Sequence, residues 1–154
     1  MKYARVIQSP IGPLTLVEED AALTELRFGN ETQGLLPGDT PLLREAAAQL
    51  AEYFSGRRRA FDLPLRPKGT PFQLRCWDAL LQIPFGETRS YGQQAAMIGN
   101  PKACRAVGMA NHHNPLPVLI PCHRVVGANG SLTGYGGGLG IKETLLQIER
   151  MKPE

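Results

Sequence analysis

Cysteine and histidine are scarce in this chain, which has three of each among 154 residues and neither type before Cys76. An odd number of cysteines offers no complete set of disulfide pairs. No Cys-x-x-Cys or His-x-x-x-His spacing is present, which argues against a structural zinc site. We therefore expect free thiols in a reducing, cytoplasmic compartment, with no bound metal and no organic cofactor.

Long apolar runs are also missing. No stretch approaches the roughly 20 apolar residues that a membrane-spanning helix requires, and the first seven residues lack the uninterrupted apolar segment of a secretory signal. No internal repeat or low-complexity run is visible. We expect a globular protein with a substantial core and no association with a membrane.

The charges are divided unevenly along the chain. Residues 1–67 hold 8 Lys/Arg and 9 Asp/Glu, whereas residues 68–154 hold 9 and 5. The basic excess therefore belongs to the second part, where it is compatible with nucleic acid binding without establishing it. The basic triplet at 57–59 fits either a solvated helix end or a nucleic acid contact.

The first part predicts a small sheet with one helix. Residues 3–8 and 13–18 alternate in polarity around a turn, and 22–28 resembles a third strand. Residues 29–40 are turn-rich, and Asp39 or Thr40 is suited to cap a helix that has Pro41 at its first position. After that helix we expect a short strand at 60–65 and a linker at 66–69.

The second part predicts a mainly helical domain. Thr70 and Pro71 begin a helix, residues 92–97 form another, and Pro101 opens a third over 102–111. The break at Ile98-Gly99-Asn100 between two short helices is typical of a helix-turn-helix. An apolar strand at 118–120, a glycine-rich loop at 127–138 and a helix at 139–150 complete the prediction.

The segment Pro-Cys-His-Arg-Val at 121–125 follows that apolar run. A thiolate is the nucleophilic form of cysteine, and a neighbouring imidazole raises the thiolate fraction at neutral pH. Cys122 beside His123 is consistent with an activated nucleophile, although the bare adjacency taken alone favours a buried structural cysteine beside a surface histidine. Cys76 and Cys104 are interpreted as core cysteines.

Motifs on both sides extend the pattern over residues 70–150. They comprise Asn114-Pro-Leu-Pro-Val-Leu-Ile-Pro-Cys122-His-Arg-Val125, Thr70-Pro-Phe-Gln73, Ile83-Pro-Phe-Gly-Glu-Thr88, Ser90-Tyr-Gly92, Arg105-Ala-Val-Gly108, Gly134-Tyr-Gly-Gly-Gly-Leu139, and Lys142-Glu143 through Glu149. Together they resemble the O6-alkylguanine-DNA alkyltransferases, which move an alkyl group from a damaged base onto their own cysteine.

The resemblance implies an α+β fold in two parts. It describes residues 1–67 as a ribonuclease-H-like sheet-plus-helix domain, and residues 68–154 as a winged-helix-like domain that carries the helix-turn-helix and the reactive cysteine. Some members of the family carry zinc in the N-terminal part, but residues 1–75 contain neither Cys nor His.

The resemblance also implies a catalytic set. Cys122 would accept the alkyl group, with His123 as its base through one water and Glu149 as the anion that orients the imidazole. Asn114 would brace the cysteine turn, and Tyr91 would crowd the target phosphate near guanine N3. Arg124 is interpreted as structural, bonding backbone or carboxylates.

A second set would contact DNA and the flipped base, because a base within a duplex cannot reach a buried thiol. Arg105 would fill the gap that the base leaves, and Val125 would read the guanine amine through its carbonyl. Gly136 stands where relatives often carry serine or alanine, which suggests a roomier pocket. The remaining members of this set are Ala106, Gly108, Asn111, Pro117, Tyr135, Gly137 and Lys142.

The function that follows is direct, single-turnover repair of O6-alkylguanine in duplex DNA, with O4-alkylthymine as a lesser substrate. The protein would act as a monomer on the minor groove. Two alternative functions remain: a lesion-binding sensor that performs no transfer, and a cysteine hydrolase, which only the Cys-His pair supports.

Overall fold

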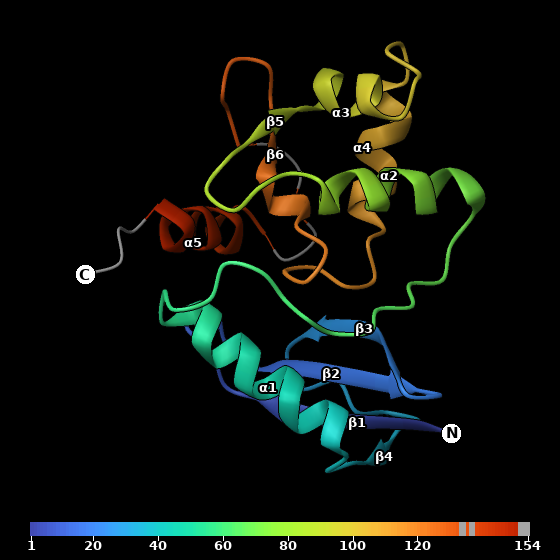
Figure 1. Ribbon diagram of the computed structural model, residues 1–154, viewed down its shortest axis with the longest axis vertical. Coiled ribbons are helices and arrows are strands. Elements are labelled where there is room, and N and C mark those ends of the chain that lie inside the picture. Colours follow the sequence, from blue (N-terminus) through green and yellow to red (C-terminus); the bar gives the residue numbers. More distant parts are fainter. Residues whose placement is uncertain (133–134, 136–137, 151–154) are drawn as a thin grey trace. The chain divides into compact units, whose positions relative to one another are not determined.

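The computed structural model describes residues 1–132, 135 and 138–150. Within these the chain divides into two compact units, residues 1–67 and 68–150 (Figure 1). Unit 1 is a sheet with one helix and unit 2 is mainly helical, which confirms the predicted α+β class. Among the described residues, no helix combines the length and the apolar character that a membrane span needs.

The sheet of unit 1 has the strand order β3-β2-β1-β4. Its central strand β2 is buried on both faces, with Leu14, Thr15, Leu16 and Val17 inside. Neighbouring strands pair antiparallel except β4, which runs parallel to β1. The strands are β1 (Lys2–Ile7), β2 (Leu14–Glu19), β3 (Ala22–Phe28) and β4 (Leu36–Pro37).

Helix α1 (Pro41–Phe54) begins as its sequence dictates. The Thr40 side chain accepts a hydrogen bond from the Leu43 N–H at 3.1 Å, and Pro41 occupies the first turn, where its missing N–H costs nothing. Its apolar stripe is buried, including Leu50 and Tyr53. Figure 1 shows this helix lying along the sheet.

Two predictions for unit 1 are wrong. The sheet has four strands rather than three, because the supposed loop contributes the two-residue β4. Residues 60–65 form no strand beyond a single bridge between Leu65 and Leu23. Two backbone positions explain this: Pro64 has no N–H to donate, and the N–H of Asp62 donates to the side chain of Gln49 on α1 at 2.9 Å.

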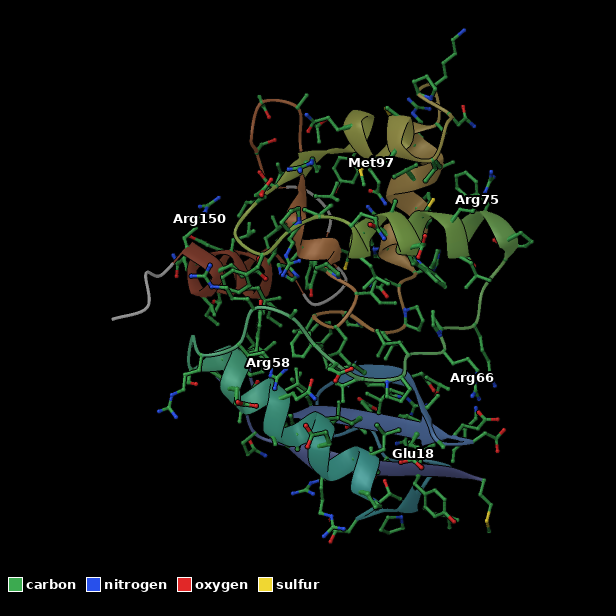
Figure 2. All side chains as sticks on the ribbon, in the orientation of Figure 1. Glu18, Arg58, Arg66, Arg75, Met97 and Arg150 are labelled. Atoms are coloured by element: carbon green, nitrogen blue, oxygen red, sulfur yellow. The ribbon has the colours of Figure 1, made fainter. Side chains whose placement is uncertain are left out.

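Unit 2 opens with two helices that carry capping boxes. Thr70 and Gln73 exchange side-chain-to-backbone hydrogen bonds at the start of α2, and Ser90 and Gln93 do the same at the start of α3. Figure 2 shows Arg75 on α2 and Met97 at the end of α3. The helices of this unit are α2 (Pro71–Leu81), α3 (Tyr91–Met97), α4 (Cys104–His112), the short 3₁₀ helix η1 (Cys122–Arg124) and α5 (Leu139–Arg150).

The helix-turn-helix is formed by α3 and α4, but α4 starts later than predicted. Pro101 and Lys102 belong to a turn closed by the Ala103 N–H on the Asn100 carbonyl at 3.0 Å, so the helix begins at Cys104. Ala103 precedes it without a side chain that can cap. The exposed Cys104 is therefore not the core cysteine that the sequence suggested, whereas Cys76 is buried.

Candidate active site and DNA-facing helix

The cysteine is delivered by a turn and not by a strand. Residues 118–120, predicted as a strand, instead form a turn: Val118 lies in the left-handed region (φ 72°), and the Ile120 N–H donates to the Leu116 carbonyl at 2.8 Å. A β-branched residue at positive φ is strained. The predicted strand is wrong because this loop satisfies its backbone groups internally.

Asn114 provides much of that internal bonding. Its amide donates to the Ile120 carbonyl at 2.8 Å, and its side-chain oxygen accepts from the Leu116 N–H at 3.0 Å. The side chain thereby spans the turn from its first residues to the one before Pro121. Pro117 is buried inside the loop. The bracing position expected for Asn114 is the one that it occupies.

Cys122 begins η1 and is 8% exposed. Burial raises the pKa of its thiol to about 11, against opposing contributions from a hydrogen bond with Asn114 and from the charge of Lys142. The resting cysteine is therefore a thiol at neutral pH. A nucleophilic role requires a base that removes its proton during the reaction.

His123 is fully buried and bound to Glu149. Its Nε2 lies 2.5 Å from Glu149 Oε2. Burial lowers the pKa of this imidazole, with the carboxylate as the main opposing influence. Burial alone would raise the pKa of Glu149, but the hydrogen bonds and charges of His123 and Arg124 outweigh it and hold that pKa at about 2.

The bond to Glu149 assigns the tautomer of His123. A carboxylate can only accept, so Nε2 of the neutral imidazole carries the hydrogen and Nδ1 presents a lone pair. Nδ1 is buried and makes no hydrogen bond to any residue in the part of the chain that the structure describes. A neutral imidazole with a free lone pair, oriented by a carboxylate beside a protonated thiol, has the form of a general base.

Arg124 clamps the same carboxylate. Its Nε and one terminal nitrogen reach the two oxygens of Glu149 at 2.8 and 3.1 Å, and its other terminal nitrogen reaches the Ile83 carbonyl at 2.7 Å. The Gly86 N–H adds a further donor at 3.4 Å. The sequence indicated that Arg124 was structural, but the adjacency of His123 and Arg124 gave no sign that both bind one carboxylate.

Two short strands connect the buried residues around Cys122 to α3, the first helix of the helix-turn-helix. Strands β5 (Arg89–Ser90) and β6 (Val125–Val126) pair in parallel, with Ser90 opposite Val126. Tyr91 follows β5 directly and is half-buried. A Cβ on Gly108 would lie 3.8 Å from its ring, an ordinary van der Waals distance, so the aromatic side chain packs beside α4 at this position.

Lys142 is completely buried on α5, where its Nζ donates to the Val125 carbonyl at 2.6 Å. Burial lowers the pKa of its ammonium group, and the neighbouring Cys122 opposes this. Tyr135 is also buried, and burial raises the pKa of its phenol. Gly136 and Gly137, predicted to border the base, lie outside the described residues.

Helix α4 has two distinct faces. Arg105 and Ala106 are exposed, and so is Met109 one turn further on. Val107, Ala110 and Asn111 are buried on the opposite face. Asn111 was predicted to contact DNA, but its amide is turned inward and is bonded to Gln94. No pattern in the sequence pointed to Gln94.

A surface hollow of about 320 Å³ lies elsewhere on unit 2, and none of the predicted site residues lines it. Its lining residues are Arg75, Asp78, Ala79, Gln82, Met97 and Ile98. Among the described residues, no three His, Cys, Asp or Glu side chains gather where they could hold a metal ion. The buried groups around Cys122 are therefore the candidate for chemistry.

Both units match models of one protein family. Residues 2–67 match the ribonuclease-like domain of 6-O-methylguanine DNA methyltransferase, and residues 71–151 match the DNA binding domain of the same family.

Curated relatives agree over nearly their whole length. The methylated-DNA–protein-cysteine methyltransferase of Methanosarcina acetivorans is 48% identical over 96% of this chain and 97% of its own. The constitutive enzyme of that name from Bacillus subtilis is 48% identical over 98% and 97%.

Solved structures show the same fold. Mycobacterium tuberculosis OGT in complex with DNA superposes with a TM-score of 0.90 at 51% identity, covering 96% of this chain and 92% of that one. The O6-methylguanine methyltransferase of the same organism gives 0.89 at 49% identity, covering 97% and 93%. The chain therefore belongs to the methylated-DNA–protein-cysteine methyltransferases, the family of direct DNA repair by alkyl transfer.

Proposed function

We propose that Cys122 is the residue onto which this protein moves the alkyl group of O6-alkylguanine in duplex DNA. The observation that carries the proposal is the buried Cys122, His123 and Glu149 set, in which the residue that follows a protonated thiol is a neutral histidine bound to a carboxylate. Glu149 is held in turn by Arg124.

In this mechanism the thiol proton passes to His123 Nδ1 through one water. The sulfur lone pair attacks the alkyl carbon in line, a C–S bond forms, and the bond between that carbon and O6 breaks with its electron pair left on the purine. The guanine takes up one proton in exchange for the one left on His123 and departs neutral, so that the overall proton count is unchanged. Because a thioether is a poor leaving group and no described residue is placed to remove it, each molecule acts once.

The exposed face of α4 is the proposed contact with the minor groove. Arg105 would enter the space that the flipped base leaves, while Ala106 and Gly108 allow close approach of the helix. Tyr91 would crowd the phosphate of the target nucleotide. The similarity to an OGT that was solved in complex with DNA supports this assignment.

The flipped base would lie against Tyr135, Gly136 and Gly137. Val125 would read its exocyclic amine, since a carbonyl oxygen has two lone pairs and the bond from Lys142 uses only one of them. Pro117 would form part of the wall. O4-alkylthymine as a lesser substrate, a monomeric state, a cytoplasmic location and independence from metal or cofactor belong to the same proposal.

Intact mass spectrometry tests the reaction. The protein is mixed with an equimolar duplex that contains one O6-methylguanine, and the modified residue is located by peptide mapping. A stoichiometric gain of one methyl group on Cys122 is expected. Tight binding without a mass gain would instead indicate a lesion sensor, and hydrolysis of an ester without lasting modification would indicate a cysteine hydrolase.

A further inference from the structure

Two buried amide side chains form a closed pair between the helices of the helix-turn-helix. Asn111 on α4 donates to the Gln94 oxygen at 2.7 Å, and Gln94 on α3 donates to the Asn111 oxygen at 2.9 Å. Gln94 is completely buried and Asn111 is 8% exposed. We call this pair the amide clasp.

The clasp also forms a hydrogen bond with helix α2. The Gln94 amide donates to the Cys76 carbonyl on α2 at 3.1 Å. Buried amides are costly unless they are hydrogen-bonded, and each partner here satisfies the other. Apolar packing tolerates small rotations and shifts of a helix, whereas reciprocal amide bonds are directional and weaken steeply away from their good geometry. The clasp therefore defines how α4 is rotated and positioned along its axis relative to α3.

The clasp stands between the DNA-facing surface and the cysteine turn. Asn111 belongs to the last turn of α4, the helix that exposes Arg105. Its carbonyl accepts the N–H of Asn114 at 3.2 Å, and the Asn114 side chain braces the loop that ends at Cys122. A shift of α4 against α3 would therefore change the placement of Arg105 relative to Cys122.

We propose that Gln94 and Asn111 are positioning residues for repair of duplex DNA. The clasp aligns the exposed face of α4 with the cysteine turn, so that the arginine that displaces the base and the thiol that receives the alkyl group engage the same nucleotide. This inference rests on the proposed function. It predicts that the clasp is needed for transfer from a duplex and is dispensable for transfer from a free O6-alkylguanine base.

The test uses Gln94→Met, Asn111→Leu and the double variant. Each single change leaves one buried amide without its partner and should lower thermal stability. The double change removes both polar groups and should regain most of that loss. Transfer from the duplex should stay about tenfold or more below the unmodified protein in the double variant, because small misplacements of reacting groups have large kinetic effects. Its rate with free O6-benzylguanine should match the unmodified protein.

Two further variants separate positioning from packing. The exchange Gln94→Asn with Asn111→Gln keeps both amides and their combined length, and it should restore the ratio of duplex to free-base rates. Asn111→Ser retains a polar group that is too short for the reciprocal bonds, and it should lower that ratio even if the apolar double variant does not fold. Gln49→Leu removes a comparable buried amide in unit 1, and it should lower stability without changing the ratio.

An unchanged ratio in the double variant and in Asn111→Ser would overturn the inference and would reduce the clasp to helix packing. That result leaves the proposed function intact, since the unmodified protein still transfers. Absence of any transfer by the unmodified protein would overturn the proposed function itself, and the inference with it.

Discussion

The two units differ in where their charged side chains lie. In unit 1 the ion pairs lie at the surface, such as Arg5 with Asp39 at 3.2 Å, where the side chains are 37% and 75% exposed. In unit 2 four ionisable side chains of one cluster are almost completely buried. These are His123, Arg124, Lys142 and Glu149.

This difference separates charge that adds little to stability from charge arranged for chemistry. An exposed pair gains little, because water already solvates both partners. Burying an imidazole, a carboxylate and two cations is costly, and the cost is tolerated where perturbed proton affinities are useful. Unit 1 thus keeps its ion pairs at the surface, whereas unit 2 buries charged groups around the proposed nucleophile Cys122.

Cys122→Ala is the strongest test of this contrast. Transfer of the alkyl group should be abolished, while affinity for duplex DNA stays close to that of the unmodified protein, because the thiol serves the chemistry and not the docking. Intact mass and a binding titration measure the two quantities. Cys104→Ser is the matched control, since it removes an exposed thiol and should transfer normally. A persistent mass gain on the alanine variant would place the acceptor elsewhere.

Glu149→Gln tests the relay. Loss of the orienting carboxylate should slow transfer by roughly 10²-fold or more at neutral pH. Because His123 then removes the thiol proton less effectively, the rate should recover as the pH rises toward the pKa of the cysteine. Single-turnover rates over a pH series measure this. An unchanged rate at neutral pH would remove Glu149 from the mechanism.

The buried cluster also predicts a response of stability to acid. Glu149 has a pKa of about 2 in the fold against 4.5 as a free side chain, so its contribution is fully present above pH 4.5 and is lost as the pH falls toward 2. The lowered pKa of His123 also makes the fold less stable in acid, and this loss begins as the pH falls below 6.5, the ordinary pKa of histidine. The lowered pKa of Glu149 corresponds to about 3 kcal/mol of unfolding free energy. Denaturant unfolding between pH 7 and 2.5 should show a flatter profile in the Glu149→Gln variant than in the unmodified protein.

Arg105→Ala tests whether the exposed arginine of α4 helps to flip the damaged base out of the duplex. Transfer from a duplex should fall much more than transfer from a free O6-alkylguanine base, because only the duplex requires flipping, which costs a few kcal/mol. The loss of one positive charge should also weaken the salt dependence of binding, by less than one unit in the slope of log K against log salt concentration. The informative quantity is the ratio of the two rates at one salt concentration. Equal losses on both substrates would assign Arg105 a purely structural or electrostatic role.

Arg5→Ala should have the smallest effect. Its exposed pair with Asp39 should contribute less than about 0.5 kcal/mol to unfolding free energy, and transfer rates should be unchanged. Thermal and denaturant unfolding measure it. A large loss of stability would mean that the surface charges of unit 1 matter more than their exposure implies.

Local patterns predicted much of this fold correctly. The three long strands, the caps at Thr40 and Thr70 and the helix at 139–150 follow from periodicity and from residues that satisfy backbone groups within a few positions. The mistakes have two causes, a distant pairing partner and a local turn that the apolar pattern did not reveal. Strand β4 exists only because β1 offers it a partner, and the apolar residues 118–120 form a turn because Asn114 bonds both ends of their loop.

The order of residues alone determined the reactive motif, its family and the pairing of a cysteine with a histidine next to it, because those signals are contiguous in the chain. Tertiary structure decided what no contiguous pattern contains. It brought Glu149 to both His123 and Arg124, turned Asn111 inward onto Gln94, and buried the ammonium group of Lys142 beside the Val125 carbonyl. The physical reason is that these side chains acquire their protonation states and their roles from burial and from partners that lie as many as 63 positions away.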